Sequence, residues 1–289
     1  MCKYQYNTLK WTAVAIVFIV CFACLEGFSE EADEEMNLRI GAIRSQKREL
    51  GKWDDWERQE AQLLDLAKDY NSPAEKGKIY TEIARLYSQE GYRFRSEDPR
   101  IPKAIKYCKE ALKYPLDVTS ACEMHGSLAD TMLIKYWNYP EEEFVKIRQE
   151  AIVHCLTGLK LALDCNAPKE HPEPPGRMTV YHIYPQKGPV YEEAVRKHKE
   201  QLAAHKKWQF MEKLYFQRKG LTQICVTLYS HKPYSTDEFK LTAEKILKGH
   251  EDAAKELIAE VEAEIARLTE REAEIARKEK GSVSDQNDK

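Results

Sequence analysis

From residue 53 onward, the hydrophobic positions of the chain recur every three or four residues. The first such stretch contains Trp53, Trp56, Leu63, Ala67 and Tyr70. Glu60 is its one polar member. This spacing places the side chains on one face of an α-helix, and no run of alternating β-branched residues competes with it. The sequence therefore predicts an all-α fold.

Capping residues mark where the predicted helices begin. Ser72 and Glu75 flank Pro73, which combines a capping box with a proline at the first helical position. The same Ser-x-x-Glu pattern returns at Ser120–Glu123 and Ser235–Glu238, and Tyr139–Pro140 precedes three glutamates. Helices of ordinary length are therefore expected to follow one another with short turns.

A weak internal repeat links two parts of the chain. The first part contains Ala104, Ile105, Cys108, Ala111 and Leu112, and the second has the same spacing at Ala151, Ile152, Cys155, Gly158 and Leu159. Upstream of these, Ile83, Ala84 and Tyr87 correspond to Leu128, Ala129 and Met132. Small residues at such positions let antiparallel helices approach closely, so two helix pairs share one packing pattern. An ordinary helical bundle that carries small residues by chance is the alternative.

At these residues the chain resembles the tetratricopeptide (TPR) repeat family. Its first-helix pattern is matched by Tyr80, Ile83, Ala84 and Tyr87, and its second-helix pattern by Ala104, Cys108 and Ala111. A second unit resembles the family at His125, Leu128, Ala129 and Met132, then at Ala151, Cys155 and Gly158. Cys108 is smaller than the family's usual residue, Pro115 comes one residue early, and residues 91–101 look like an inserted loop. The resemblance covers residues 73–164.

The resemblance implies a short solenoid of stacked helix pairs whose first helices line a partner-binding groove. The matching positions are Lys78, Thr81, Arg85, Ser88, Glu123, Gly126 and Asp130. Lys78 and Arg85 would lie on one helix face and would bind a partner's carboxylate, unless both are ordinary solvated charges.

The N-terminal residues differ in composition from the rest. Lys3 and Lys10 precede an uncharged run from residue 11 to residue 25, and acidic residues follow. This order predicts that residues 1–25 are an export signal, and the run is shorter than the roughly 20 residues that span a bilayer. A signal anchor and a lipoprotein site at Cys24 remain alternatives, and each places the mature chain outside the cytoplasm. Residues 26–50 are predicted to form a polar stalk.

The rest of the chain divides by its proline content and its periodicity. Residues 51–164 hold the TPR-like pattern, and residues 165–190 are a proline-rich loop or linker. The pattern of residues 191–248 predicts further helical hairpins. One helix runs from Tyr191 toward Leu214, and a pair of helices follows at residues 221–228 and 238–247. Residues 249–280 carry a heptad pattern, and residues 281–289 form a polar tail that is predicted to be disordered.

The heptad pattern predicts a helix with one apolar face that packs against another helix. Its members are Ile258, Val261, Ile265, Leu268 and Ile275, with Glu272 as the one polar member. The seam either joins a partner helix in a coiled coil or caps the solenoid by packing on the preceding pair.

Charge and chemistry narrow the function. The net charge of −3 comes from mixed acidic and basic residues, which argues against a dedicated nucleic-acid binder. The cysteines beyond residue 25, Cys108, Cys122, Cys155, Cys165 and Cys225, lack metal-site or redox spacing and are interpreted as core residues, although an oxidising compartment permits a disulfide.

The histidines are scattered, and neither a phosphate loop nor a catalytic motif is present. We therefore expect a non-enzymatic protein-binding or scaffolding module without a cofactor. The alternative is a novel or degenerate enzyme with a site beneath the proline-rich loop. One predicted helix concentrates basic residues, which either meet an acidic partner or form a solvated surface: Arg196, Lys197, Lys199, Lys206 and Lys207.

Overall fold

The structure, a computed structural model, describes residues 34–46, 53–88, 98–136, 141–176, 189–230 and 236–287. Within those ranges the protein is all-α and contains no strand, as the sequence predicts. A helix at residues 34–44 precedes α2 (Trp53–Asp69), α3 (Pro73–Ser88), α4 (Arg100–Ala111), α5 (Val118–Tyr136), α6 (Glu141–Asp164), α7 (Pro189–Ser230), α8 (Thr236–Ile246) and α9 (Glu251–Asn287).

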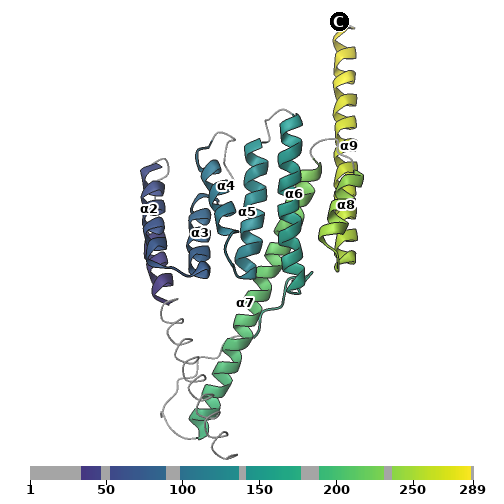
Figure 1. Cartoon of the computed structure of the whole chain (residues 1–289). Helices are drawn as coiled ribbons and strands as arrows, with labels where there is room; N and C mark the ends of the chain where they lie inside the picture. Colours follow the sequence, from purple (N-terminus) through teal and green to yellow (C-terminus); the bar gives the residue numbers. More distant parts are fainter. Residues whose placement is uncertain are drawn as a thin grey trace, which may run out of the picture.

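Helices that follow one another along the chain pack side by side from α2 to α7 (Figure 1). In addition, α5 contacts both α3 and α7, so these three helices form a connected layer. Beyond that layer, α8 packs on α6 and α9, and α9 also packs on α7. Figure 1 shows the C-terminal part of α9, in yellow, extending past the other helices.

The capping box at the start of α3 is confirmed. The Ser72 amide donates to Glu75 Oε2 at 3.1 Å, and the Glu75 amide donates to Ser72 Oγ at 3.2 Å. The predicted start of α5 at Ser120–Glu123 is wrong, because Asp117 caps this helix and accepts a bond of 3.0 Å from the Ser120 amide. Ser235 and Tyr139–Pro140 lie outside the described residues.

One predicted helix boundary in the C-terminal part does not exist. Residues 189–230 form the single helix α7, where the sequence predicted one helix ending near Leu214 and another beginning at Leu221. Both of these leucines are buried, and they are spaced by two helical turns on one face. Packing of this continuous face holds Gly220 within the helix despite its low helix propensity.

Two other segments predicted to lack structure contain helix. Within the predicted stalk of residues 26–50, residues 34–44 are helical, and Met36 and Ile40 are buried one turn apart. Within the predicted tail, α9 continues to Asn287. The export segment of residues 1–25 and most of the predicted inserted loop lie outside the described residues, and no helix among those described is long and apolar enough to cross a membrane.

The repeat positions lie in the core. Tyr80, Ile105, Leu112 and His125 are half-buried. The following repeat positions are buried: Ile83, Ala84, Tyr87, Ala104, Cys108, Ala111, Leu128, Ala129, Met132, Ala151, Ile152, Cys155, Gly158 and Leu159. Gly158 shows why small residues are needed. A Cβ added there would lie 3.0 Å from the Cβ of His125 and 3.1 Å from a methyl group of Leu221, so α5, α6 and α7 meet closely at this point.

Candidate functional site

The side chains predicted to line a groove on α3 and α5 are largely committed to contacts within the protein. Thr81 is buried, and Gly126 packs against α7, where a Cβ added to the glycine would lie 3.3 Å from a methyl group of Leu221. Lys78 and Ser88 are half-buried on α3. Of these positions, Thr81 and Gly126 are therefore contact residues between helices.

Arg85 joins α3 to α5. Its Nε and Nη2 donate to the two carboxylate oxygens of Glu123 at 2.8 and 2.5 Å, and its Nη1 donates to Glu82 at 2.5 Å. Burial by itself lowers the pKa of Arg85, but the hydrogen bonds to Glu123 and the charge of Glu82 outweigh it and raise the pKa above its ordinary value. Arg85 is thus paired within the protein, and its binding of a partner's carboxylate stays a prediction.

Asp130, the last predicted groove residue, is half-buried near the middle of α5. Burial raises the pKa of its carboxyl group. Asp130 does not join the Arg85 ion pairs, whose acidic members are Glu82 and Glu123.

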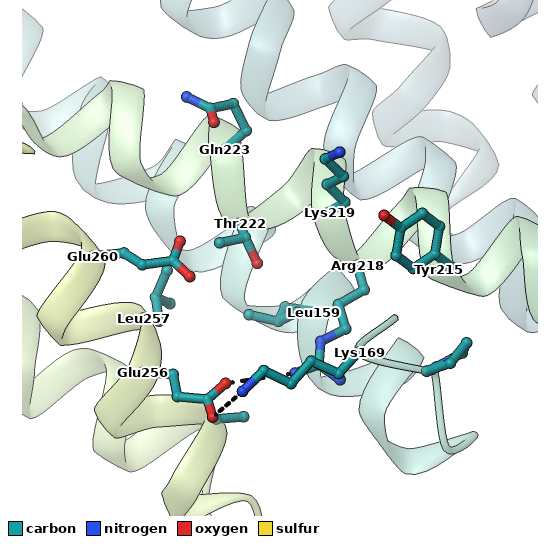
Figure 2. A pocket seen from close by; sticks show the side chains of 12 residues that line it. Leu159, Lys169, Tyr215, Arg218, Lys219, Thr222, Gln223, Glu256, Leu257 and Glu260 are labelled. Carbon is teal, nitrogen blue, oxygen red and sulfur yellow. Dashed lines mark hydrogen bonds and ion pairs between the residues drawn. The ribbon is translucent and has the colours of Figure 1, made fainter. Parts of the chain in front are cut away.

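A hollow whose lining residues the sequence did not predict lies between α7, α9 and the loop after α6. Its volume is about 330 Å³, and Figure 2 shows the side chains around it. The apolar part of the lining comprises Leu159, Pro168, Ala253 and Leu257. A hollow of this size takes a small molecule or a few side chains of a peptide.

One end of the hollow is closed by ion pairs. Lys169 Nζ lies 2.7 Å from Glu256 Oε1, and Arg218 Nη2 lies 3.8 Å from Glu256 Oε2 (Figure 2). Arg218 Nη1 also donates to the carbonyl oxygen of Ala167 at 3.1 Å. The loop is thereby fastened to α7 and α9, and the pKa of Glu256 is lowered by its hydrogen bond with Lys169.

The other end carries charges of both signs that belong to none of the ion pairs found among the described residues. Lys219 lies with its ammonium group 6.0 Å from the ring centre of Tyr215, and Glu260 faces it across the hollow from α9. A carboxylate and an ammonium group on opposite walls would bind complementary charges of a partner. The lining residues come from three segments that are distant in the sequence, so no local motif predicts the hollow. The one sequence signal at its edge is the proline-rich break that begins at Pro168.

Two histidines that the sequence left scattered meet between α5 and α6. The Nδ1 atoms of His125 and His154 lie 3.0 Å apart, so one donates a hydrogen bond to the other. Burial, and then the neighbouring His154, lowers the pKa of His125 to about 4, and burial lowers that of His154. The pair is neutral at pH 7 and belongs to no group of three or more metal-ligating side chains among the described residues.

Glu60, the polar member of the first hydrophobic stripe, is a buried hub between α2, α3 and α4. It accepts hydrogen bonds from Tyr107, from the Tyr87 hydroxyl at 2.5 Å and from Lys103 Nζ at 2.5 Å. Burial opposes ionisation of Glu60, but these hydrogen bonds, that of Lys103 foremost, outweigh it and lower the pKa. Burial and then Glu60 raise the pKa of both tyrosines. The arrangement satisfies a buried carboxylate and so serves stability.

In comparisons with known proteins, no family model, curated protein or solved structure matches this chain.

Proposed function

We propose that this protein is an extracytoplasmic helical scaffold of TPR-like type that binds another protein. The observation that carries the proposal is the layer formed by α3, α5 and α7, each contacting the next, while α4 and α6 fill the positions between them along the chain. In the TPR-like arrangement the first helices of successive pairs contact one another in this way. The buried small residues Ala104, Ala151 and Gly158 support the same assignment.

The hollow in Figure 2 is the proposed contact surface for the partner. It has an apolar floor, and its rim carries an ammonium group and a carboxylate that form no ion pair within the described residues, a combination suited to a peptide segment with mixed charge. The groove on α3 and α5 is a poorer choice because Arg85 and Glu123 satisfy each other. An enzyme with a site under the proline-rich loop would use this same hollow, but Lys169 of the loop and Glu256 of α9 are already paired there.

The binding surface is tested by filling the hollow. Thr222 lies in its wall on α7, so Thr222→Trp should block a partner, whereas Thr269→Trp, on the exposed part of α9, is the matched control. Each tagged variant is used to recover proteins from an envelope extract. We expect one set of partners with the wild type and with Thr269→Trp, and its loss with Thr222→Trp at unchanged helicity. Equal recovery by both variants would remove the hollow as the binding surface.

Export is tested separately. A reporter that is active only outside the cytoplasm is fused to residues 1–40, and the control fusion carries residues 26–40 alone. Activity of the first fusion and inactivity of the second are expected, because the basic residues and the apolar run all lie before residue 26. If the first fusion stays in the cytoplasm, the extracytoplasmic assignment is contradicted. The proposal about the binding surface is not affected by that result.

A further inference from the structure

The first half of α7 forms an arm that its neighbours leave largely uncovered. Leu214 is the first fully buried residue of this helix among those described, and we call residues 191–213 the α7 arm. In Figure 1 the arm, in green, runs down and away from the row of α3 to α6. The arm holds the basic residues that the sequence singled out, and the structure shows which of them are satisfied.

The basic residues of the arm divide into two groups. Arg196 pairs with Glu193 at 2.7 Å and with Glu200 at 2.6 Å, and Lys197 lies 3.4 Å from Glu193. These cations are therefore neutralised along their own helix.

The second group has no acidic partner among the described residues. It includes Lys207 and three exposed lysines that recur every seven residues, Lys199, Lys206 and Lys213. Seven residues are about two helical turns, so the three ammonium groups lie along one face over about 21 Å. No acidic residue stands three or four positions from any of them. We call these three lysines the lysine stripe.

Exposed apolar side chains accompany the lysine stripe, two of them within the α7 arm and Phe216 three residues beyond it. Leu202 is 37% exposed, Phe210 41% and Phe216 55%, and helical geometry places all three within about a third of a turn of the stripe. Large side chains that remain in water on a basic face indicate a surface that another phase or molecule covers. A second copy of the chain is a poor candidate, because it would bring one lysine stripe against another.

We propose that the α7 arm binds the surface of an anionic lipid bilayer through the lysine stripe. The ammonium groups would meet lipid phosphates, and the leucine and the two phenylalanines would enter the boundary between head groups and acyl chains. An acidic polypeptide or a nucleic acid would neutralise the lysines as well, but a charged polymer offers no apolar phase for Phe216 and Leu202. The mixture of both kinds of side chain on one exposed face therefore favours the bilayer.

The test measures binding of the full-length protein to vesicles of phosphatidylcholine alone and of phosphatidylcholine with an equal amount of phosphatidylglycerol. The apolar residues 11–25 contribute to binding in both, so the readout is the ratio of the two partition coefficients. The variant Lys199→Gln, Lys206→Gln, Lys213→Gln should reduce this preference for anionic vesicles by about a hundredfold at low salt. The variant Leu202→Ser, Phe210→Ser, Phe216→Ser should weaken binding to anionic vesicles by about tenfold or more.

A charge-matched control removes three exposed lysines elsewhere, Lys68→Gln, Lys113→Gln, Lys255→Gln, and should keep the preference. Circular dichroism checks that every variant remains helical. Equal loss in the control would mean that total charge alone drives binding and would overturn the proposal. The proposal would also be overturned if the serine variant kept its affinity for anionic vesicles and the protein bound polyglutamate or single-stranded DNA as tightly as the vesicles. The lysine stripe would then be a site for an acidic polymer.

Discussion

The stacked helices α2 to α6 and the two long helices α7 and α9 differ in where the ion-pair partners of their charged residues lie. In the stack, several half-buried charges join different helices: Arg85 on α3 binds Glu123 on α5, and Lys103 on α4 binds Glu60 on α2. Other pairs of the stack stay within one helix, as between Arg85 and Glu82. In the long helices, ion pairs often stay within one helix, as between Arg196 and Glu193 or between Arg267 and Glu264.

This difference indicates which part of the molecule is fixed and which part is available. An ion pair between two helices ties their positions together and leaves neither charge for a partner. A pair between neighbours on one helix stabilises that helix by only a few tenths of a kcal/mol and leaves the remaining faces open. Partner surfaces are therefore expected on α7 and α9, and substitutions in the stack should act mainly on stability.

The largest effect is expected at the hub of the stack. Glu60→Ala would leave two tyrosine hydroxyls and Lys103 without their buried acceptor and should lower the free energy of unfolding by about 3 kcal/mol. Glu57→Ala is the control, because Glu57 is half-exposed and lies 3.4 Å from the same lysine. Urea titration measures both variants. Equal small losses would show that the stack does not depend on its internal charges.

A somewhat smaller effect is expected where helix pairs meet. Ala104 and Ala151 are buried, so Ala104→Leu and Ala151→Leu should overpack their contacts and cost about 1–3 kcal/mol each. Val153→Leu, at an exposed site on α6, should change stability by less than about 0.5 kcal/mol. If thermal unfolding of all three variants matches the wild type, close approach at the small residues is not what holds the pairs together.

Replacing two glycines with alanine should change the free energy of unfolding in opposite directions. A Cβ at Gly77 would lie 2.9 Å from a Leu116 methyl group and 3.0 Å from the Pro115 carbonyl oxygen, so Gly77→Ala should destabilise the protein by about 1–2 kcal/mol. A Cβ at Gly220 in α7 meets nothing within 4 Å, so Gly220→Ala should stabilise it by up to about 1 kcal/mol. Chemical denaturation of the pair compares the stack with the long helix directly, and a shared sign would contradict the contrast.

The last effect concerns pH. Burial holds the pKa of His125 at about 4, below its unfolded value of 6.5, so the unfolded chain binds a proton that the folded chain does not. Stability is then complete above about pH 6.5 and falls as the pH drops toward 4, with a loss of about 2 kcal/mol by about pH 5. His125→Gln should show a shallower decline in melting temperature over this range. An identical decline in variant and wild type would place the pH dependence elsewhere.

Much of the stack follows from local patterns in the sequence. The capping box at Ser72 and Glu75 is confirmed because both of its bonds lie within one helical turn. Small residues such as Ala104 and Ala151 are buried because helical spacing alone places them beside the large apolar residues. The importance of Gly77 was missed, since its requirement comes from the turn at Leu116, a contact that no local pattern records.

The long helices and the hollow depend on contacts between distant segments. From the local sequence, Gly220 is expected to interrupt the helix. The helix continues because Leu214 and Leu221 lie on one buried face. Lys169, Arg218 and Glu256 meet only after the loop, α7 and α9 have packed, so their pairing has no sequence motif. Similarly, the sequence shows that α7 is basic, but only the observed ion pairs separate Arg196 from the lysine stripe.

The distribution of cysteines gives the chain a set of built-in reporters of local opening. Burial raises the pKa of Cys108 and of Cys122 to about 12, and it raises that of Cys155 as well. A thiol reacts as its thiolate, so these three are protected from alkylating reagents while α4, α5 and α6 stay closed. The rate at which each one is alkylated under native conditions therefore measures how often the helix that carries it detaches from the stack.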